Sequence, residues 1–223
     1  MPVITDVALD IVDFVALHID QPVRRNFHEY FGHYHLSFRA HRAGPFDDEL
    51  APGQVKFRDD IDRLFARNGI AFTLGEDMQV CRLGPPEARS LISAFTPDSG
   101  DRQLDIKLND AMTRFLSRAP GDRRDALEKL WDAFEQVKYI ESGGQTKNVK
   151  QSVTRLLDRA APGALRAELE AEFNALNQIG NNFSIRHHGG QQQPLPGDAA
   201  VDYLFIRLAS VIAFVLRQTG RLT

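Results

Sequence analysis

The second half of the chain carries apolar residues at helical spacing almost without interruption, and this pattern constrains the fold more than any other feature. Apolar side chains recur three or four residues apart from about residue 101 to residue 217. This period predicts helices that each bury one face. The gap between residues 116 and 122 and the breaks at Gly143-Gly144, at Pro162-Gly163 and in the loop 189–197 divide the pattern into five helices. The helices are expected over residues 105–116, 122–140, 149–157, 165–183 and 198–217. The last one is apolar nearly all round, so we expect it to be the core element of a bundle.

The first half mixes helical periods with one strand-like stretch. Residues 71–74 and 78–83 flank Gly75-Glu76-Asp77, which predicts a β-hairpin with a short loop. The sequence therefore predicts a mainly α protein, a helical bundle with one small β-hairpin in its N-terminal part. We expect an N-terminal helical module over residues 1–100 and the bundle over residues 101–223. Helices of the module are predicted at 5–19, from Pro22 through Phe31, at 55–68 and at 87–95, and residues 35–38 are compatible with an extended segment.

Composition narrows the class of protein. The chain has 223 residues, of which 43% are hydrophobic and 26% are charged, as in ordinary soluble globular proteins. The net charge of −3 argues against indiscriminate coating of nucleic acid. The single cysteine, Cys81, rules out an internal disulfide and fits a reducing cytoplasm. The most apolar run, 203–215, contains Arg207 and looks too short to span a membrane. The N-terminus lacks the order of a signal peptide, so we expect a cytoplasmic protein with no membrane partner.

The segment 181–190 concentrates polar groups at the end of a predicted helix. Asn181 and Asn182 precede Arg186, which is followed at once by His187 and His188. If the helix continues, Asn182 and Arg186 share a face. A guanidinium pairs with two phosphate oxygens, and an imidazole takes a proton from a ribose 2′-hydroxyl or gives one to the leaving oxygen. These groups suit metal-independent RNA cleavage. The alternative is a polar helix end in which arginine and histidine bond the last carbonyls.

Two further sets of polar residues allow more than one interpretation. Glu135 and Lys138, three apart on a predicted helix, form either a surface ion pair or a support for Arg186 from a neighbouring helix. His28, His33, His35 and His41 invite a metal interpretation. However, His28 and His33 are five apart rather than the four of a zinc-protease helix. We therefore expect no metal site and no cofactor.

The residues around the polar segment resemble a known group of proteins. The stretch 177–217, with Asn-Gln-Ile-Gly-Asn-Asn-Phe-Ser-Ile-Arg-His-His and a closing apolar helix, resembles the C-terminal part of bacterial abortive-infection proteins of the HEPN (higher eukaryotes and prokaryotes nucleotide-binding) superfamily. The pattern Ala-Leu-Glu-Lys-Leu-Trp-Asp-Ala-Phe-Glu at 126–135 is similar to the preceding helix of that group. Residues 57–83 resemble the N-terminal part of AbiJ-like proteins.

This resemblance implies a bundle that forms a homodimer with two Arg/His motifs facing one cleft. It also implies an endoribonuclease, a hydrolase used in antiviral defence or as a toxin, with RNA as substrate and an antitoxin or a phage-derived trigger protein as possible partner. Arg186 would polarise the scissile phosphate, His187 or His188 would act as general acid and base, and Asn182 would orient the motif. The superfamily usually places its histidine four to six residues after the arginine, where this chain has Gly190, Gln191 and Gln192. A HEPN-fold protein that binds RNA or nucleotide, or regulates, without cutting is therefore the alternative.

Overall fold

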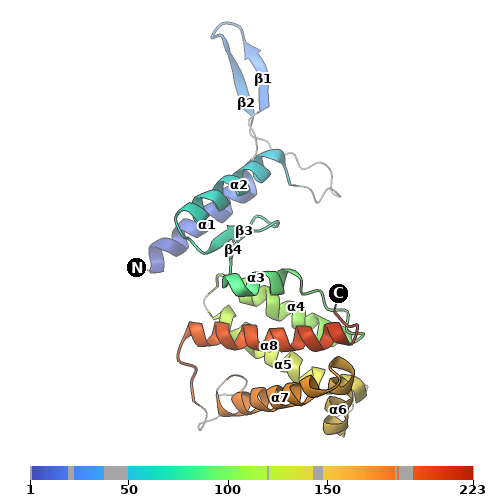
Figure 1. The fold of residues 1–223 in the computed structure, drawn as a ribbon. Coiled ribbons are helices and arrows are strands. Elements are labelled where there is room, and N and C mark those ends of the chain that lie inside the picture. The colour runs from blue at the N-terminus through green and yellow to red at the C-terminus, as the bar shows by residue number, and fades with distance from the viewer. Residues whose placement is uncertain are drawn as a thin grey trace. The chain divides into compact units, whose positions relative to one another are not determined.

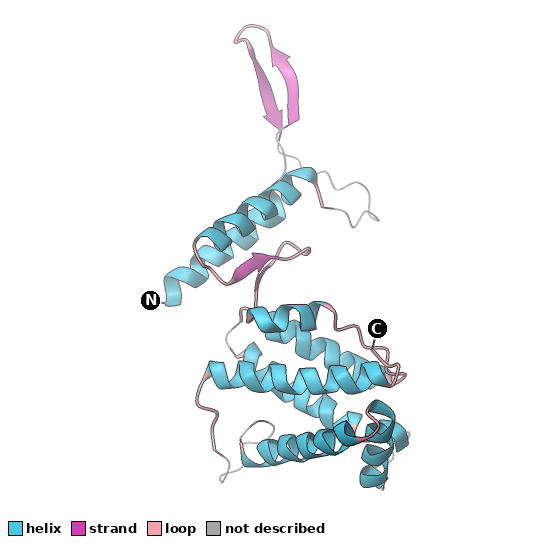
Figure 2. Ribbon diagram, in the orientation of Figure 1, coloured by secondary structure: helices cyan, strands magenta, loops and turns pink. Residues whose placement is uncertain are grey.

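The chain divides between Leu83 and Gly84 into two units, Met1–Leu83 and Gly84–Thr223. The structure, a computed structural model, describes residues 2–19, 23–37, 50–119, 121–142, 148–183, 185 and 193–222 (Figure 1). Helices predominate in these residues, and their sheets are two antiparallel ribbons of two strands each (Figure 2). The mainly α prediction is therefore confirmed, with a second hairpin in addition to the expected one. The sequence predicted a division after residue 100. The observed division lies earlier and assigns helix α3 (Pro86–Ser93) to the second unit.

The first unit contains helices α1 (Pro2–His18) and α2 (Pro52–Arg67) and the predicted hairpin, β3 (Phe72–Leu74) and β4 (Val80–Arg82). Carboxylates on the two helices hold the hairpin. The buried Asp13 of α1 accepts a 2.5 Å hydrogen bond from the Val80 amide, and Asp62 of α2 accepts one of 2.8 Å from the Leu74 amide. A small apolar core lies between these elements and contains Leu9, Ala16, Phe65, Leu74, Met78 and Val80.

A second hairpin replaces the helix that the sequence predicted from Pro22 through Phe31. Strand β1 (Val23–His28) pairs with β2 (His33–Ser37), and a bulge shifts the register between Arg25 and Phe27. The helical prediction was wrong because it depended on the spacing of Phe27, Tyr30 and Phe31. In the hairpin, Phe27 pairs with Tyr34, while Tyr30 and Phe31 occupy the turn.

The second unit is a helical bundle with one continuous core. After α3, its elements are α4 (Arg102–Leu116), α5 (Asp122–Val137), the short 3-10 helix η1 (Ile140–Ser142), α6 (Val149–Ala160), α7 (Ala164–Asn182) and α8 (Asp198–Gln218). Helix α5 packs against α4 and α8, and the stacked rings of Phe115 and Phe205 lie 3.9 Å apart between centroids. On α5 the predicted apolar stripe is buried, including Trp131 and Phe134, and Phe134 contacts Phe173 of α7.

Helix α8 is the most apolar element of this unit. It spans 21 residues, and among the helices that the structure describes it alone is long and apolar enough to cross a membrane. The expectation that this run is too short was wrong, because the helix extends beyond the run 203–215 at both ends. Half of its most apolar window is buried inside the protein, as in the core helix of a bundle. Its central charge is paired, since Arg207 donates two 2.8 Å hydrogen bonds to the Glu172 carboxylate on α7.

Candidate functional site

Helix α7 ends inside the polar segment 181–190. Its last residue is Asn182, and Phe183 adopts an extended conformation (φ −108°, ψ 148°) while its amide donates to the carbonyl oxygen of Ile179 at 3.0 Å. The predicted helical relation between Asn182 and Arg186 is therefore wrong, because the helix does not continue to residue 186. Arg186, His187 and His188 themselves lie outside the described residues.

The residues on either side of Arg186–Gln192 are bonded to each other. The Gln193 amide donates a 3.0 Å hydrogen bond to the carbonyl oxygen of Asn182, and Phe183 and Gln193 form a parallel β-bridge. Ile185 and Leu195 are buried in the core of the bundle, with exposed fractions of 5% and 8%. The described residues that flank 186–192 therefore meet at one place, the C-terminal end of α7.

Lys138 connects α5 to α7 a little more than one turn before that place. Its Nζ donates to Glu135 Oε1 at 2.7 Å and to Asn177 Oδ1 at 2.8 Å, and it lies 5.3 Å from the centroid of the Phe134 ring. The expected ion pair between Glu135 and Lys138 is present, but its placement at the surface was wrong, because Lys138 is only 8% exposed. The other interpretation, support of Arg186, stays a prediction.

A cavity of about 500 Å³ lies beside this lysine, between α6 and α7. Two lysines, Lys138 and Lys150, line it together with amide, hydroxyl and carboxylate groups. On α7 the lining residues Asn174 and Asn177 are three apart, and Asn181 follows four residues later, so the three amides share one face. Sequence reasoning missed Asn174 and Asn177, although their spacing along the predicted helix was a usable signal. The remaining lining residues are Val149, Val153, Thr154, Glu170 and Phe173.

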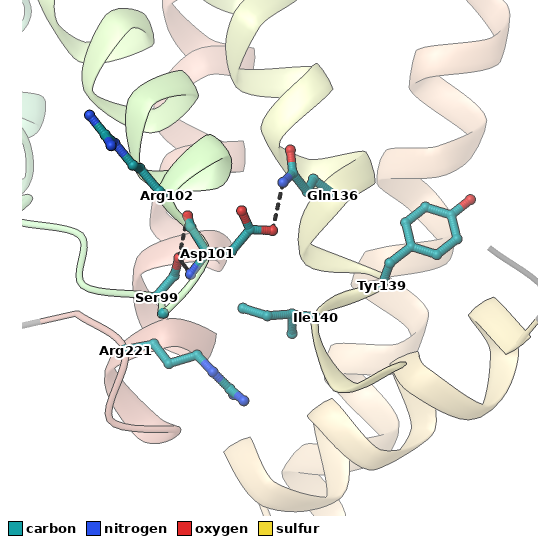
Figure 3. Close-up of a pocket in the computed structure, with 8 residues that line it drawn as sticks. Ser99, Asp101, Arg102, Gln136, Tyr139, Ile140 and Arg221 are labelled. Carbon is teal, nitrogen blue, oxygen red and sulfur yellow. Dashed lines mark hydrogen bonds between the residues drawn. The ribbon is translucent and has the colours of Figure 1, made fainter. Parts of the chain in front are cut away.

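A second cavity, of about 530 Å³, lies at the N-terminal end of α4 (Figure 3). Asp101 caps that helix by accepting hydrogen bonds from the amides of Gln103 and Leu104. Its other oxygen accepts a 2.7 Å hydrogen bond from Gln136 Nε2 on α5, and Lys107 Nζ donates to Gln136 Oε1 at 2.8 Å. The helix terminus already has its own anion, so this network is structural. Besides Asp101 and Gln136, the lining residues are Ser99, Gly100, Arg102, Tyr139, Ile140 and Arg221.

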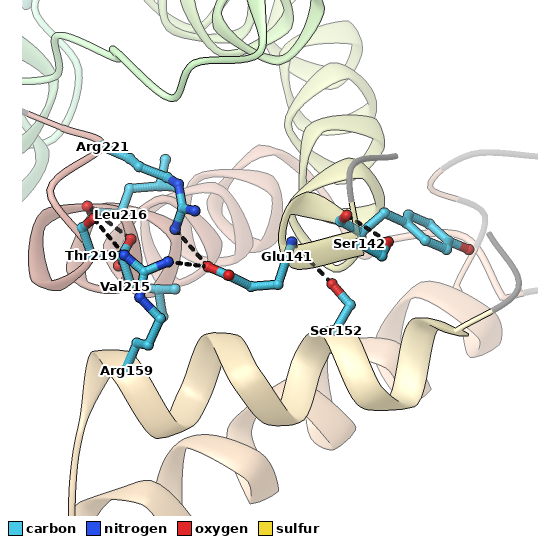
Figure 4. Close-up of polar contacts among 9 residues, drawn as sticks. Glu141, Ser142, Ser152, Arg159, Val215, Leu216, Thr219 and Arg221 are labelled. Atoms are coloured by element: carbon cyan, nitrogen blue, oxygen red, sulfur yellow. Dashed lines mark hydrogen bonds and ion pairs between the residues drawn. The ribbon is translucent and has the colours of Figure 1, made fainter. Parts of the chain in front are cut away.

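Glu141 is the centre of a network that holds the C-terminal segment (Figure 4). Its Oε1 accepts hydrogen bonds from Arg159 at 2.7 Å and from Arg221 at 2.8 Å, and its amide donates to Ser152 Oγ at 3.1 Å. The carboxylate side chain is only 13% exposed. These bonds tie η1 to α6 and to the residues after α8, which again is a structural role.

Metal and thiol chemistry find little support in the described part of the chain. There, no group of three or more His, Cys, Asp or Glu residues could hold a metal ion. His28, His33 and His35 lie side by side on the hairpin, and His41 falls outside the described residues. Burial raises the pKa of the Cys81 thiol, whose Sγ contacts the Thr73 carbonyl oxygen at 3.7 Å. A packed thiol rather than a nucleophile is the better description of Cys81.

No family model, no curated protein and no solved structure matches this chain. The HEPN resemblance therefore rests on the residues quoted above and stays a prediction.

Proposed function

We propose that the second unit is a metal-independent endoribonuclease of an abortive-infection or toxin system, with Arg186 and one of the histidines His187 and His188 as catalytic residues. The observation that carries the proposal is that the described residues flanking 186–192 are bonded to each other at the C-terminal end of α7. Asn182 and Gln193 are bonded to each other, and Ile185 is buried, so a cationic segment of seven residues is attached to a rigid bundle at one place. Catalytic groups on loops act from rigid scaffolds of this kind.

The proposed reaction needs only groups that the sequence supplies. One imidazole removes the proton from a ribose 2′-hydroxyl, and the oxygen attacks the adjacent phosphorus. The bond to the 5′-oxygen breaks, and that oxygen receives a proton from an imidazolium. Arg186 stabilises the negative charge on the phosphate in the transition state. The products are a 2′,3′-cyclic phosphate and a 5′-hydroxyl.

The polar lining of the cavity between α6 and α7 supports an RNA substrate. Lys150 lines it, and the amides of Asn174, Asn177 and Asn181 form a polar row along α7 toward its C-terminal end. Ribose and phosphate oxygens are the partners that such groups prefer. A homodimer that joins two such ends in one cleft, an antitoxin or phage-derived trigger, and a cytoplasmic location belong to the same proposal.

The alternative is a protein that binds RNA or a nucleotide, or regulates a partner, without cutting. The sequence feature that favours it is the position of the histidines, which follow Arg186 directly, while Gly190, Gln191 and Gln192 stand where the superfamily usually has its histidine.

Cleavage of single-stranded RNA by the purified full-length chain in excess EDTA separates the two. The nuclease proposal expects cleavage by the unmodified chain and a loss of at least about 100-fold in Arg186→Ala. It also expects a comparable loss in His187→Ala or in His188→Ala. Arg89→Ala, which removes an exposed arginine on α3, is the matched control and should cut normally. Tight binding by an unmodified chain that cuts no RNA would establish the alternative instead.

A further inference from the structure

The β1–β2 hairpin of the first unit presents large apolar side chains to solvent. Phe27, Tyr34 and Leu36 on its strands are about half exposed, and Tyr30 and Phe31 in its turn are more exposed still. Within the described residues, each strand is hydrogen-bonded only to the other. A hairpin without a core of its own is marginally stable, so these rings serve a purpose other than packing.

The strand register sorts the side chains into two faces. Arg24 is paired with Leu36, and Phe27 is paired with Tyr34. All four side chains point to the same face of the hairpin. On that face the rings of Phe27 and Tyr34 lie 4.8 Å apart between centroids, and the guanidinium carbon of Arg24 lies 5.6 Å from the Tyr34 ring centroid. Two exposed rings and a guanidinium thus form one continuous surface, which we call the stacking face.

The opposite face is also basic in character. It carries Arg25 opposite His35 and His28 opposite His33, and the three imidazole centroids lie 5.6 to 5.8 Å from one another. Over residues 23–37 two arginines stand against one acid, Glu29, whereas the whole chain has a net charge of −3. The hairpin thus has a formal net charge of +1 beside its exposed aromatic rings, in a chain whose net charge is −3.

We infer that the β1–β2 hairpin is a binding arm for single-stranded nucleic acid. Unpaired bases stack on Phe27 and Tyr34, while Arg24, on the same face, contacts the backbone phosphates. Base stacking on exposed rings contributes about 1–3 kcal/mol per base, and every base has a face that can stack. A polyanion with aromatic bases engages exposed rings and a neighbouring guanidinium at the same time. This arm goes beyond the proposed nuclease site and does not require that the second unit cuts RNA.

The test measures binding of a fluorescent RNA of about 12 nucleotides by fluorescence anisotropy. The protein is the full-length chain carrying Arg186→Ala, so that cleavage does not interfere with the measurement. We expect Phe27→Ala and Tyr34→Ala each to weaken binding by about tenfold. Phe27→Tyr, which keeps the ring, should bind as the Arg186→Ala parent does, and Phe27→Leu, which keeps apolar bulk without a ring face, should not. Arg24→Ala should reduce the slope of log Kd against log salt concentration by about 1, because one phosphate contact is lost.

Three results would overturn the inference. One is no binding of single-stranded RNA or DNA up to about 100 µM protein at low salt. Another is binding that is the same in Phe27→Ala, Tyr34→Ala and the parent. The third is that RNA binding does not depend on these two rings, whereas self-association or binding to anionic lipid vesicles does. The hairpin would then be a contact between copies of the chain or a contact with a membrane. Tyr203→Ala, which removes an exposed ring on α8, is the control and should leave RNA binding unchanged.

Discussion

Gly180 of α7 lies against the indole of Trp131 of α5 so closely that a Cβ at this glycine would be 2.4 Å from Nε1 and 2.9 Å from Cε2. The indole is 1% exposed and is surrounded by the core of the second unit, so it has no free space to move into. Glycine is therefore required on α7 two residues before the helix ends. The contact sets the distance between α5 and α7 close to the attachment of the candidate catalytic segment.

Gly180→Ala should lower the free energy of unfolding by about 1–3 kcal/mol, because the methyl group forces the two helices apart. The direction is informative, since alanine in a helix is ordinarily about 1 kcal/mol more favourable than glycine. Urea unfolding of the two proteins measures the difference. Gln178→Ala, an exposed substitution on the same helix, is the control and should stay within about 0.5 kcal/mol. A Gly180→Ala protein as stable as the parent would contradict the packing described.

The bond between Lys138 and Asn177 should appear as a coupling in stability. Lys138→Met and Asn177→Ala each remove one side of a 2.8 Å hydrogen bond that joins α5 to α7. The loss in the double variant should be smaller than the sum of the single losses by about 0.5–3 kcal/mol, because the bond is lost only once. Chemical unfolding of the four proteins gives this number. Strict additivity would mean that the two side chains do not interact.

The ion pair between Glu172 and Arg207 should make stability depend on acid pH. The two hydrogen bonds from Arg207 hold the pKa of the Glu172 carboxyl below its usual range. A carboxyl with a lowered folded-state pKa stabilises the fold above its unfolded-state pKa, and this contribution is lost as the pH falls through the folded-state pKa. Arg207→Gln should therefore be less stable than the parent at neutral pH, with a difference that shrinks in acid.

Unfolding in urea between about pH 7 and about pH 3 measures this difference. The exposed pair Lys56 and Asp60 provides the control, because Lys56→Gln removes a similar bond in open solvent and should change stability little at any pH. If the difference in unfolding free energy between Arg207→Gln and the parent stays constant down to the lowest pH, the ion pair is not the cause of that difference.

Glu141→Gln should loosen the C-terminal segment. The substitution keeps the shape of the side chain but removes the negative charge that Arg159 and Arg221 share. We expect a loss of about 1–3 kcal/mol and faster hydrogen exchange at residues 219–222, since two cations are left without their anion. Asp158→Asn, which changes an exposed partner of Arg166, should cost less than about 1 kcal/mol. If hydrogen exchange at residues 219–222 is unchanged in Glu141→Gln, the Glu141 carboxylate does not hold the C-terminal segment in place.

Helical periodicity predicted the second unit well, because each of its long helices buries one face in a shared core. The hairpin 71–83 was also predictable, since a strand period flanks a short polar loop. The β1–β2 hairpin was not, because Phe27, Tyr30 and Phe31 have helical spacing by coincidence, and within the described residues these side chains are exposed rather than buried against another element.

The site was less predictable than the fold. The burial of Lys138 depends on α7, which is distant in sequence, and an exposed pair three residues apart has the same pattern. The end of α7 at Asn182 was missed because Phe183 fits the apolar period. The bond that closes this end comes from Gln193, eleven residues after the acceptor. Both the burial of Lys138 and the end of α7 depend on contacts between segments that are distant in the sequence.

The end groups of cleaved RNA test the central proposal most directly. Full-length protein is incubated with a single-stranded RNA in excess EDTA, and the termini of the products are identified by mass spectrometry. The account predicts 2′,3′-cyclic phosphates and 5′-hydroxyls from the unmodified chain, and no such products from Arg186→Ala. Intact RNA after incubation with the unmodified chain, or products with 3′-hydroxyl and 5′-phosphate ends, would contradict it.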